Sequence, residues 1–244
     1  MEKVDILGVK FSPFDIDMCA DYIFNLAQKE GFHYAFTPNS EMVMAADKDG
    51  EFKEILNSAD ILTADGIGII YASKILKNPI EQRASGYDIS LKLLEKMAET
   101  GKSVYLFGAS PEVNAVATEK LKEKYPSLII SGNSDGYFDK NKEKKIIEDI
   151  NSKKPDFLFV CLGSPKQEKW IYENRDKLLA KVAMGLGGCL DVYAGNVKRA
   201  PDIFIRLGLE WFYRLITQPK RFFRMLALPQ FMIKVLFHKQ ERKL

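Results

Sequence analysis

The sequence contains few of the residues that build metal centres and disulfide frameworks. Its 244 residues include only three cysteines and two histidines. Cys19, Cys161 and Cys189 are far apart and lie in apolar surroundings, which favours buried thiols over a disulfide framework or a zinc site. Because His33 and His238 are the only imidazoles, we expect no metal ligated by nitrogen and sulfur.

Long apolar runs are also absent. No run reaches the ~18 apolar residues of a transmembrane helix, because Arg, Lys or Glu interrupts each candidate. The opening residues, MEKVDILGVKF, mix acidic and basic side chains and lack the order of regions in a signal peptide, so we expect no export signal. These absences predict a cytoplasmic protein that does not span a membrane.

Several motifs of nucleotide and metal enzymes are missing. The sequence has no P-loop GxxxxGK[ST], no HExxH and no dinucleotide GxGxxG, since the GIG of residues 66–68 lacks the third glycine. A nucleotide-binding oxidoreductase is therefore disfavoured. Asp15 and Asp17 match the DxD pattern with which many sugar-nucleotide enzymes hold a metal, but an apolar helical pattern follows them, so helix capping is the favoured interpretation.

Charge divides the chain into two parts. From Gly195 onward there are eleven Lys or Arg against three Asp or Glu, within totals of 36 and 33, which leaves 25 against 30 in the rest. We therefore predict a catalytic domain over residues 1–195 and a basic appendage over residues 196–244. This segregation suggests that the appendage meets something anionic.

Short β-rich runs alternate with helical patterns along residues 1–195. The runs are 33–37, 60–64, 103–108, 128–132, 156–163 and 181–187. Helical patterns lie between them, for example at 90–100 and at 111–125, where Pro111 suits a first helical turn. This order is typical of βαβ units, so we predict an α/β fold with a mostly parallel sheet flanked by helices.

Clusters of Gly, Asn, Asp, Ser and Thr follow nearly all of these runs. They are Thr37 to Ser40, Asp65 to Gly68, Gly108 to Ser110, Gly132 to Gly136, Gly163 to Pro165, and Gly187 with Gly188. In a parallel sheet such loops gather on one edge, where open α/β sheets bind ligands and helix N-termini favour phosphate. Turn preferences alone would explain any single cluster, but they explain six together less well.

The chain changes character from Ala200. Large apolar and basic residues are dense, and Pro219 and Pro229 favour the start of new helical segments, so we predict two or three short amphipathic helices. Such helices pack on a core or lie on an anionic membrane surface, and both interpretations stay open. Binding of nucleic acid is disfavoured, because it leaves the glycine-rich edge unexplained.

Seven segments, in order across nearly the whole chain, resemble motifs of the WecG/TagA/CpsF glycosyltransferase family. They are TPNSEMV (37–43), ADGIGI (64–69), RASGYD (83–88), LFGASPE (106–112), LGSPKQEKW (162–170), GLGGCLDVYAGNVKRAP (185–201) and GLEWFYRL followed by PKRFFR (208–224). The resemblance is strongest to the TagA branch of wall teichoic acid synthesis.

This resemblance implies a Rossmann-like domain that ends in a membrane-associating appendage. The implied reaction moves N-acetylmannosamine from UDP to the 4-hydroxyl of N-acetylglucosamine on undecaprenyl diphosphate, with inversion to a β linkage. A related transfer from another UDP-sugar, carrying N-acetylmannosaminuronic acid or glucose, is the alternative. The implied partners are this donor, the lipid-linked acceptor and the inner face of the cell membrane, with no cofactor; a dimer or trimer stays open.

Asp65 suits the role of catalytic base. Inversion needs one group to take the proton of the acceptor hydroxyl, while a nucleoside diphosphate leaves without an acid. Asp65 ends a strand on the ligand edge, and Gly66 and Gly68 let backbone and substrate come close. An ordinary Asp titrates near ~3.9 and is ionised at neutral pH. The alternative is that Asp65 only caps the helix running to Lys77.

Without a metal, arginines, amides or helix N-termini must meet the growing charge on the diphosphate. Arg83 is the candidate in the body, with an ion pair that holds a loop as its alternative role. Arg214, Arg221 and Arg224 are the candidates for the acceptor diphosphate, on a helical face that Pro219 could interrupt. The appendage would then close over the active-site edge at the membrane; a solvated basic face is the alternative.

Neutral polar residues complete the predicted site. Thr37, Asn39 and Gln167 suit recognition of sugar hydroxyl and N-acetyl groups, although each could equally start a helix. The predicted donor contacts are Gly66, Gly108, Ser110, Gly163, Gly187, Gly188 and Asp191. In this prediction Asp191 accepts hydrogen bonds from ribose or uracil, and the others bring backbone close to the donor.

Overall fold

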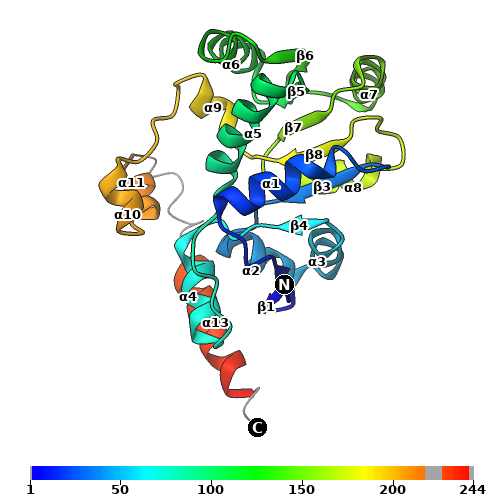
Figure 1. Cartoon of the computed structure of the whole chain (residues 1–244). Coiled ribbons are helices and arrows are strands. Elements are labelled where there is room, and N and C mark those ends of the chain that lie inside the picture. The colour runs from blue at the N-terminus through cyan, green and yellow to red at the C-terminus, as the bar shows by residue number, and fades with distance from the viewer. Residues whose placement is uncertain (1, 218–226, 242–244) are drawn as a thin grey trace.

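A computed structural model describes residues 2–217 and 227–241 of the chain. Its centre is a six-stranded sheet in the order β4-β3-β8-β7-β5-β6, and all of these neighbours pair in parallel (Figure 1). The strands are β3 (His33–Phe36), β4 (Ile61–Leu62), β5 (Ser103–Gly108), β6 (Ile129–Ser134), β7 (Phe157–Cys161) and β8 (Val182–Gly185). All six overlap the predicted runs, which confirms the Rossmann-like α/β fold.

Alternate residues of each strand face opposite layers of helices. Tyr105 and Phe107 of β5 belong to one core cluster, whereas Val104 and Leu106 belong to the other. The first layer contains α2 (Ser40–Lys48), α3 (Gly50–Asn57), α7 (Lys140–Lys153) and α8 (Lys166–Asn174), and the second contains α1 (Ile16–Leu26), α5 (Gly86–Thr100), α6 (Pro111–Lys124) and α9 (Cys189–Tyr193). Strands that helices cover on both faces are apolar along most of their length, so continuous apolar runs in the sequence predicted them.

Helix capping accounts for the DxD pattern. The Oδ1 atom of Asp15 accepts a hydrogen bond from the backbone N–H of Met18 at 2.8 Å, and thus caps α1 as predicted. Asp17, in the first turn of α1, pairs with Lys92 of α5. Both carboxylates therefore stabilise helix α1.

The three cysteines are buried and form no disulfide, as the sequence predicted. Burial raises the pKa of Cys19 and of Cys161 to about 12, and the carboxylate of Asp15 adds to the shift at Cys19. Both thiols are therefore neutral at physiological pH, and the absence of thiolate makes them poor nucleophiles.

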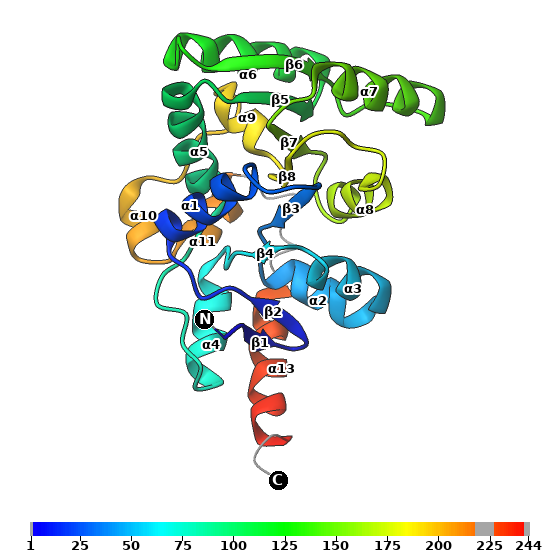
Figure 2. The ribbon, with the colours of Figure 1, turned by 45° about the vertical axis from the view of Figure 1, so that its right-hand side comes forward.

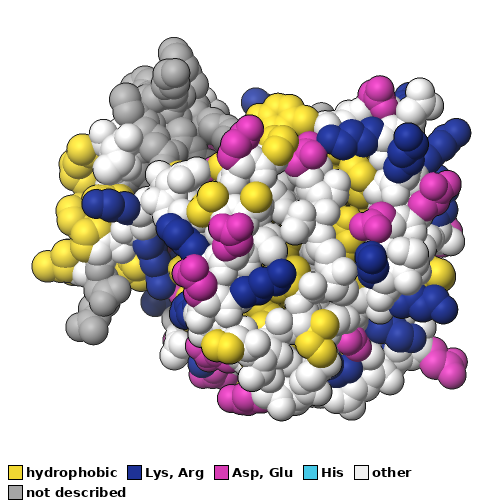
Figure 3. Space-filling view, turned by 90° about the horizontal axis from the view of Figure 1, so that it is seen from above, with side chains coloured by type: hydrophobic (Ala, Val, Ile, Leu, Met, Phe, Trp, Pro, Cys, Tyr) yellow, Lys and Arg dark blue, Asp and Glu magenta, His cyan; other side chains and the backbone are white. Residues whose placement is uncertain are grey.

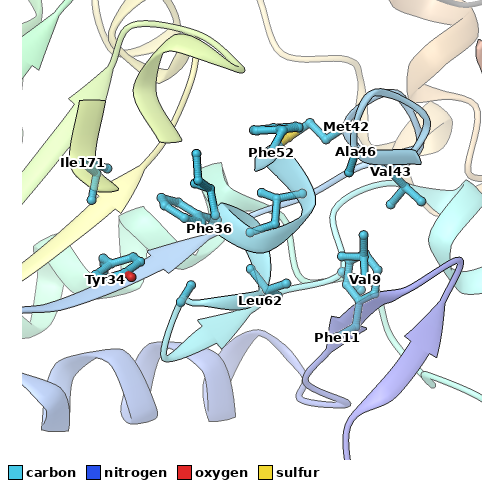
Figure 4. Packing of buried hydrophobic residues seen from close by; sticks show 14 of the residues in the cluster. Val9, Phe11, Tyr34, Phe36, Met42, Val43, Ala46, Phe52, Leu62 and Ile171 are labelled. Atoms are coloured by element: carbon cyan, nitrogen blue, oxygen red, sulfur yellow. The ribbon is translucent and has the colours of Figure 1, made fainter. Parts of the chain in front are cut away.

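An N-terminal hairpin was not predicted. Strands β1 (Val4–Ile6) and β2 (Val9–Phe11) pair in antiparallel fashion and bury Val9 and Phe11 in the first core cluster, near α2 and α3 (Figure 4). The connecting residues Leu7 and Gly8 both have positive φ, 55° and 85°. Leucine adopts positive φ rarely. The sequence has no Asn-Gly or Asp-Gly pair at this turn, which is the usual signal of such hairpins, and it therefore did not predict one.

The tail forms helices, as predicted. They are α10 (Asp202–Arg206), α11 (Glu210–Thr217) and α13 (Ala227–Glu241). Pro229 lies in the first turn of α13, whereas Pro219 lies outside the described residues. Within the described ranges, no helix has both the length and the apolar character needed to cross a bilayer.

Helix α13 belongs to the main hydrophobic core. It packs on α2 and on α4 (Ile67–Ile75), and its Phe231 and Val235 are completely buried in the first core cluster (Figure 2). The core therefore includes residues on both sides of Gly195, and the predicted division into two domains stays a prediction.

Two phenylalanines of α13 test this packing. Phe231 is 0% exposed and Phe237 is 63% exposed. Phe231→Ala should lower the free energy of unfolding by about 3 kcal/mol, because it removes a buried ring and leaves a cavity. Phe237→Ala should change it by less than about 0.5 kcal/mol. Urea unfolding followed by circular dichroism measures both, and equal effects would contradict the packing described.

Candidate active site

Asp65 lies at the carboxyl edge of the sheet, beside the loop that follows β3. Its backbone N–H donates to the carbonyl oxygen of Pro38 at 3.2 Å, and its Oδ1 accepts from Nε of Arg83 at 3.3 Å. The Asp65 side chain is 29% exposed, so a ligand on this edge can reach it. The N-cap of α4 is Gly66, whose φ of 96° favours glycine, and not Asp65.

Arg83 stands between two carboxylates. Its Nη1 lies 2.7 Å from Oε2 of Glu210, in addition to its contact with Asp65. Burial opposes the charge of the guanidinium, but Asp65, Glu210 and Asp88 together raise the pKa of Arg83 above its ordinary value. Glu210 opens α11, and no sequence pattern had singled it out. The contact brings the tail to the predicted base.

The loop after β3 places Asn39 and Thr37 near this centre. The Asn39 side chain accepts from the backbone N–H of Met42 at 3.0 Å and caps α2, which is the alternative role considered for it. Thr37 adjoins the start of α5, since a Cβ on Gly86 would come within 2.9 Å of its Oγ1. Their contacts with a sugar stay predictions.

Gly68 serves the packing of helices. A Cβ at this position would lie 2.2 Å from Oγ of Ser40 and 2.7 Å from Cδ1 of Leu228. Gly68 is also buried, so the close approach that it permits is that of α4 to α2 and α13. The expected approach of substrate is better assigned to Gly66, whose added Cβ would have only Cβ of Asn39 nearby, at 3.8 Å.

Gln167 joins two of the loops on the edge. It is 4% exposed, and its Oε1 accepts from the backbone N–H groups of Gly163 at 3.2 Å and of Gly187 at 2.8 Å. Both lone-pair positions of this oxygen are thereby used. Gln167 therefore holds the loops after β7 and β8 together, while its predicted contact with a sugar stays a prediction.

Glu168, for which the sequence predicted no role, fixes the orientation of Gln167. Its Oε1 accepts from Nε2 of Gln167 at 2.7 Å, and the residue is 0% exposed. Burial raises the pKa of Glu168, against hydrogen bonds that lower it. Its Oε2 is buried and has no hydrogen-bond partner within the described residues. In the KQEKW segment this acid resembles an ordinary surface charge, so only burial distinguishes it.

A pocket of about 570 Å³ opens at the carboxyl ends of β5 and β7. Its lining residues are Ala109, Ser110, Val113, Gly136, Tyr137, Phe138, Cys161, Leu162, Lys166 and Asp191. The chain leaves β5 toward β6 and leaves β7 toward β8, in opposite directions along the sheet. The pocket therefore lies at a topological switch point, where open α/β sheets bind their ligands.

Several of the predicted donor residues lie in or beside this pocket, whereas Gly66 is the N-cap of α4 next to Asp65, at the other end of the edge. Ser110 caps α6, and both it and Asp191 line the pocket. Gly163 and Gly187 adopt positive φ in the adjoining loops. Gly108 is needed for packing, because its φ is 131° and an added Cβ would lie 2.3 Å from the carbonyl oxygen of Cys161.

The predicted site thus falls into two groups on one edge. Thr37, Asn39, Asp65 and Arg83 lie near the ends of β3 and β4, and Ser110 and Asp191 lie near β5 and β7. β4 and β7 are three strand spacings apart, about 14 Å. Within the described residues, no three Asp, Glu, His or Cys side chains gather to hold a metal.

The tail arginines are only partly accounted for. Arg214 belongs to α11, although its side chain is not among those described, and Arg221 and Arg224 lie outside the described residues. The position of α11 is nevertheless defined by Glu210, which contacts Arg83. The role of these arginines at the acceptor diphosphate stays a prediction.

The fold and this edge define a Rossmann-like α/β protein, with a pocket at the switch point of the sheet and a carboxylate beside an arginine at the other end of the edge. The model of the Glycosyl transferase WecG/TagA/CpsF family matches residues 4–244, so the chain belongs to this family. The family resemblance noted in the sequence is thereby confirmed.

Three relatives carry the name N-acetylglucosaminyldiphosphoundecaprenol N-acetyl-beta-D-mannosaminyltransferase. Those of Bacillus spizizenii and Bacillus subtilis are 41% and 40% identical to this chain over 85% of its length and 80% of theirs. The Staphylococcus aureus relative is 36% identical over 99% of this chain and 95% of its own. The similarity to the Staphylococcus aureus relative therefore extends over both the body and the tail.

The buried acid makes stability depend on pH. Because burial raises the pKa of Glu168, the stability associated with its neutral form is complete below the ordinary value of 4.5 and is lost as pH rises through the raised pKa. Glu168→Gln is neutral at every pH. The free energy of unfolding of this variant, relative to that of wild type, should therefore increase as pH rises from the ordinary pKa of Glu168 to its raised pKa. Urea unfolding from pH 5 to 9 measures this difference, and a difference that is constant with pH would contradict it.

Proposed function

We propose that this chain is an inverting glycosyltransferase. It moves N-acetylmannosamine from UDP-N-acetylmannosamine to the 4-hydroxyl of N-acetylglucosamine on undecaprenyl diphosphate, which forms the β-1,4-linked disaccharide of the teichoic acid linkage unit. The observation that carries the proposal is the name shared by relatives that match this chain along 80% to 95% of their own length. The pairing of Asp65 with Arg83 on the ligand edge supports it.

Asp65 acts as the general base. The acceptor 4-hydroxyl oxygen attacks C1 of the donor sugar from the face opposite UDP, and its proton passes to the Asp65 carboxylate. The bond between C1 and the phosphate oxygen breaks, and UDP leaves with that electron pair. Attack from the opposite face inverts the configuration at C1. The partial exposure of Asp65 supports this role, because it leaves the carboxylate accessible to an incoming alcohol.

Positive charge near Asp65 stabilises the diphosphate. Arg83 has further N–H groups beyond those directed at Asp65 and Glu210, and a guanidinium binds phosphate oxygens well. Arg214, Arg221 and Arg224 of the tail supply charge to the acceptor diphosphate in this proposal. No metal takes part, in keeping with the structural roles of Asp15 and Asp17 in α1.

The donor lies along the edge of the sheet. Its uridine occupies the pocket at β5 and β7, where Asp191 accepts hydrogen bonds from ribose or uracil and Ser110 and Gly163 approach the phosphates. Its sugar extends toward Asp65 past Gly187 and Gly188, which follow β8. The separation of about 14 Å suits an extended nucleotide sugar.

The tail binds the inner face of the cell membrane as a peripheral element. Apolar residues of α10, its C-cap and α11 are exposed: Ile203 64%, Leu207 62%, Trp211 39%, Phe212 42% and Ile216 62%. Figure 3 shows hydrophobic side chains at the left edge of the molecule, on the side of these helices, with Lys and Arg beside them. Apolar side chains bordered by basic ones suit the interface of an anionic bilayer.

The role of Asp65 is tested by Asp65→Asn. The amide cannot take the proton, so kcat should fall by at least about 100-fold, while the affinity for UDP should stay within about twofold. Product formation from a short-chain lipid-linked N-acetylglucosamine and UDP-N-acetylmannosamine measures the rate. The control is Asp176→Asn, which should have the same kcat as wild type. Asp176 is 85% exposed and precedes β8, so it lies at the opposite edge of the sheet. Undiminished turnover by Asp65→Asn would remove the base from the mechanism.

Membrane binding is tested by a matched pair of isoleucines. Ile216 in α11 is 62% exposed and Ile129 in β6 is 48% exposed. Ile216→Asn should weaken binding to phosphatidylglycerol vesicles by about tenfold, because an apolar side chain no longer enters the bilayer interface. Ile129→Asn should leave binding unchanged. Vesicle sedimentation at fixed salt measures both, and equal binding by the two variants would reject the role of α11.

A further inference from the structure

Arg83 lies closer to Glu210 of the tail than to Asp65 of the body. Its Nη1 is 2.7 Å from Oε2 of Glu210, whereas its Nε is 3.3 Å from Oδ1 of Asp65. Contacts between a guanidinium and a carboxylate are usually about 2.7–2.9 Å long. The guanidinium is therefore drawn toward Glu210, and its contact with the proposed base is the looser of the two.

The body of the protein fixes the backbones of Arg83 and Asp65 side by side. The backbone N–H of Ala84 donates to the carbonyl oxygen of Ala64 at 3.0 Å, and Oγ1 of Thr63 donates to the carbonyl oxygen of Ala84 at 3.0 Å. These bonds hold the backbone, but the long side chain of arginine keeps several rotatable bonds. A contact of the side chain itself must therefore set the direction of the guanidinium.

Packing fixes the place at which Glu210 enters. Gly208, with a φ of 70°, lies so close to α4 that an added Cβ would come within 2.9 Å of Ile67. The rings of Phe204 in α10 and Tyr213 in α11 pack with their centroids 5.5 Å apart. The side chain of Glu210 is only 14% exposed, and a carboxylate withdrawn from water is costly unless it is paired. The start of α11 therefore presents this carboxylate to the body in a defined position.

Contacts at two different nitrogens define the plane of the Arg83 guanidinium. Nε is directed at Asp65 and Nη1 at Glu210, so the group cannot turn without losing one contact. An arginine with a single carboxylate partner favours a bidentate pair, in which two N–H groups bind both carboxylate oxygens. Such a pair with Asp65 would engage both oxygens of the proposed base. Glu210 opposes this arrangement, because it holds Nη1.

We propose that Glu210 is a positioning residue for the transfer reaction. It holds the guanidinium of Arg83 out of a bidentate pair with Asp65, so that Asp65 can accept the proton of the acceptor hydroxyl. Glu210 touches no reacting atom in this arrangement and acts through Arg83. The inference rests on the proposed function, in which Asp65 is the base, and it gives the tail a part in the transfer step that is separate from membrane binding.

Steady-state kinetics of Glu210→Ala test this role. The assay uses radiolabelled UDP-N-acetylmannosamine and a short-chain lipid-linked N-acetylglucosamine without vesicles, which removes membrane binding from the measurement. The variant should lower kcat about 10- to 100-fold, because a redirected guanidinium disturbs the geometry of the base. The KM for the donor should stay within about twofold, because Glu210 touches no donor atom. The control Glu99→Ala, at an exposed residue in the last turn of α5, should keep the kcat of wild type.

A double-mutant cycle with Arg83 distinguishes positioning from general support. Arg83→Gln removes the guanidinium, so adding Glu210→Ala to it should change kcat by less than about twofold. The same loss of kcat in both backgrounds would mean that Glu210 acts independently of Arg83, which overturns the inference. Glu210→Ala should also bind phosphatidylglycerol vesicles as wild type does. A parallel loss of vesicle binding and turnover would mean that Glu210 only holds the tail in place, which overturns it as well.

The outcomes separate this inference from the proposed function. If wild type forms the disaccharide and Glu210→Ala forms it with the same kcat, the positioning role is overturned and the proposed function is untouched. If wild type forms no product from UDP-N-acetylmannosamine, the proposed function is wrong and the inference falls with it.

Discussion

Parallel pairing of the central strands is the constraint on which the rest of the molecule depends. Each strand must be followed by a crossover to the other end of the sheet before the next begins, so every turn after a strand reaches the same edge. The central strands are buried on both faces, and their backbone N–H and C=O groups are hydrogen-bonded to neighbouring strands. Residues as distant in the chain as Asn39 and Asp191 consequently follow strands that end on one edge.

The charges on this edge are arranged in two groups, separated by the ends of β3 and β8. At one end, Arg83 links the carboxylates of Asp65 and Glu210. At the other, Lys166 lies beside a pocket that opens at the switch point of the sheet. Gln167 joins the loops after β7 and β8 and is itself oriented by the buried acid Glu168. The edge is thus stiffened at the point where an extended ligand would cross it.

The tail is attached to the body by contacts of different kinds. Phe231 and Val235 of α13 are buried in the main core, and this attachment is hydrophobic. The contact between Glu210 and Arg83 is electrostatic. A third contact is close packing at Gly208, whose φ is 70° and where an added Cβ would lie 2.9 Å from Ile67, the first residue of α4. The exposed apolar helices α10 and α11 are therefore adjacent to the residues around Asp65.

Local signals in the sequence determined the six central strands, the start of α1 at Asp15 and the helical nature of the tail. Such features depend on apolar runs, turn residues and caps that neighbours along the chain supply. The hairpin before α1 was missed because Leu7 occupies a turn position that usually takes glycine or asparagine. The tertiary structure alone decided that Gln167 would join two loops, that Glu168 would be buried and that Glu210 would reach Arg83. These outcomes depend on which distant segments pack together, and no short pattern records that choice, because burial and pairing arise only when the layers close around the sheet.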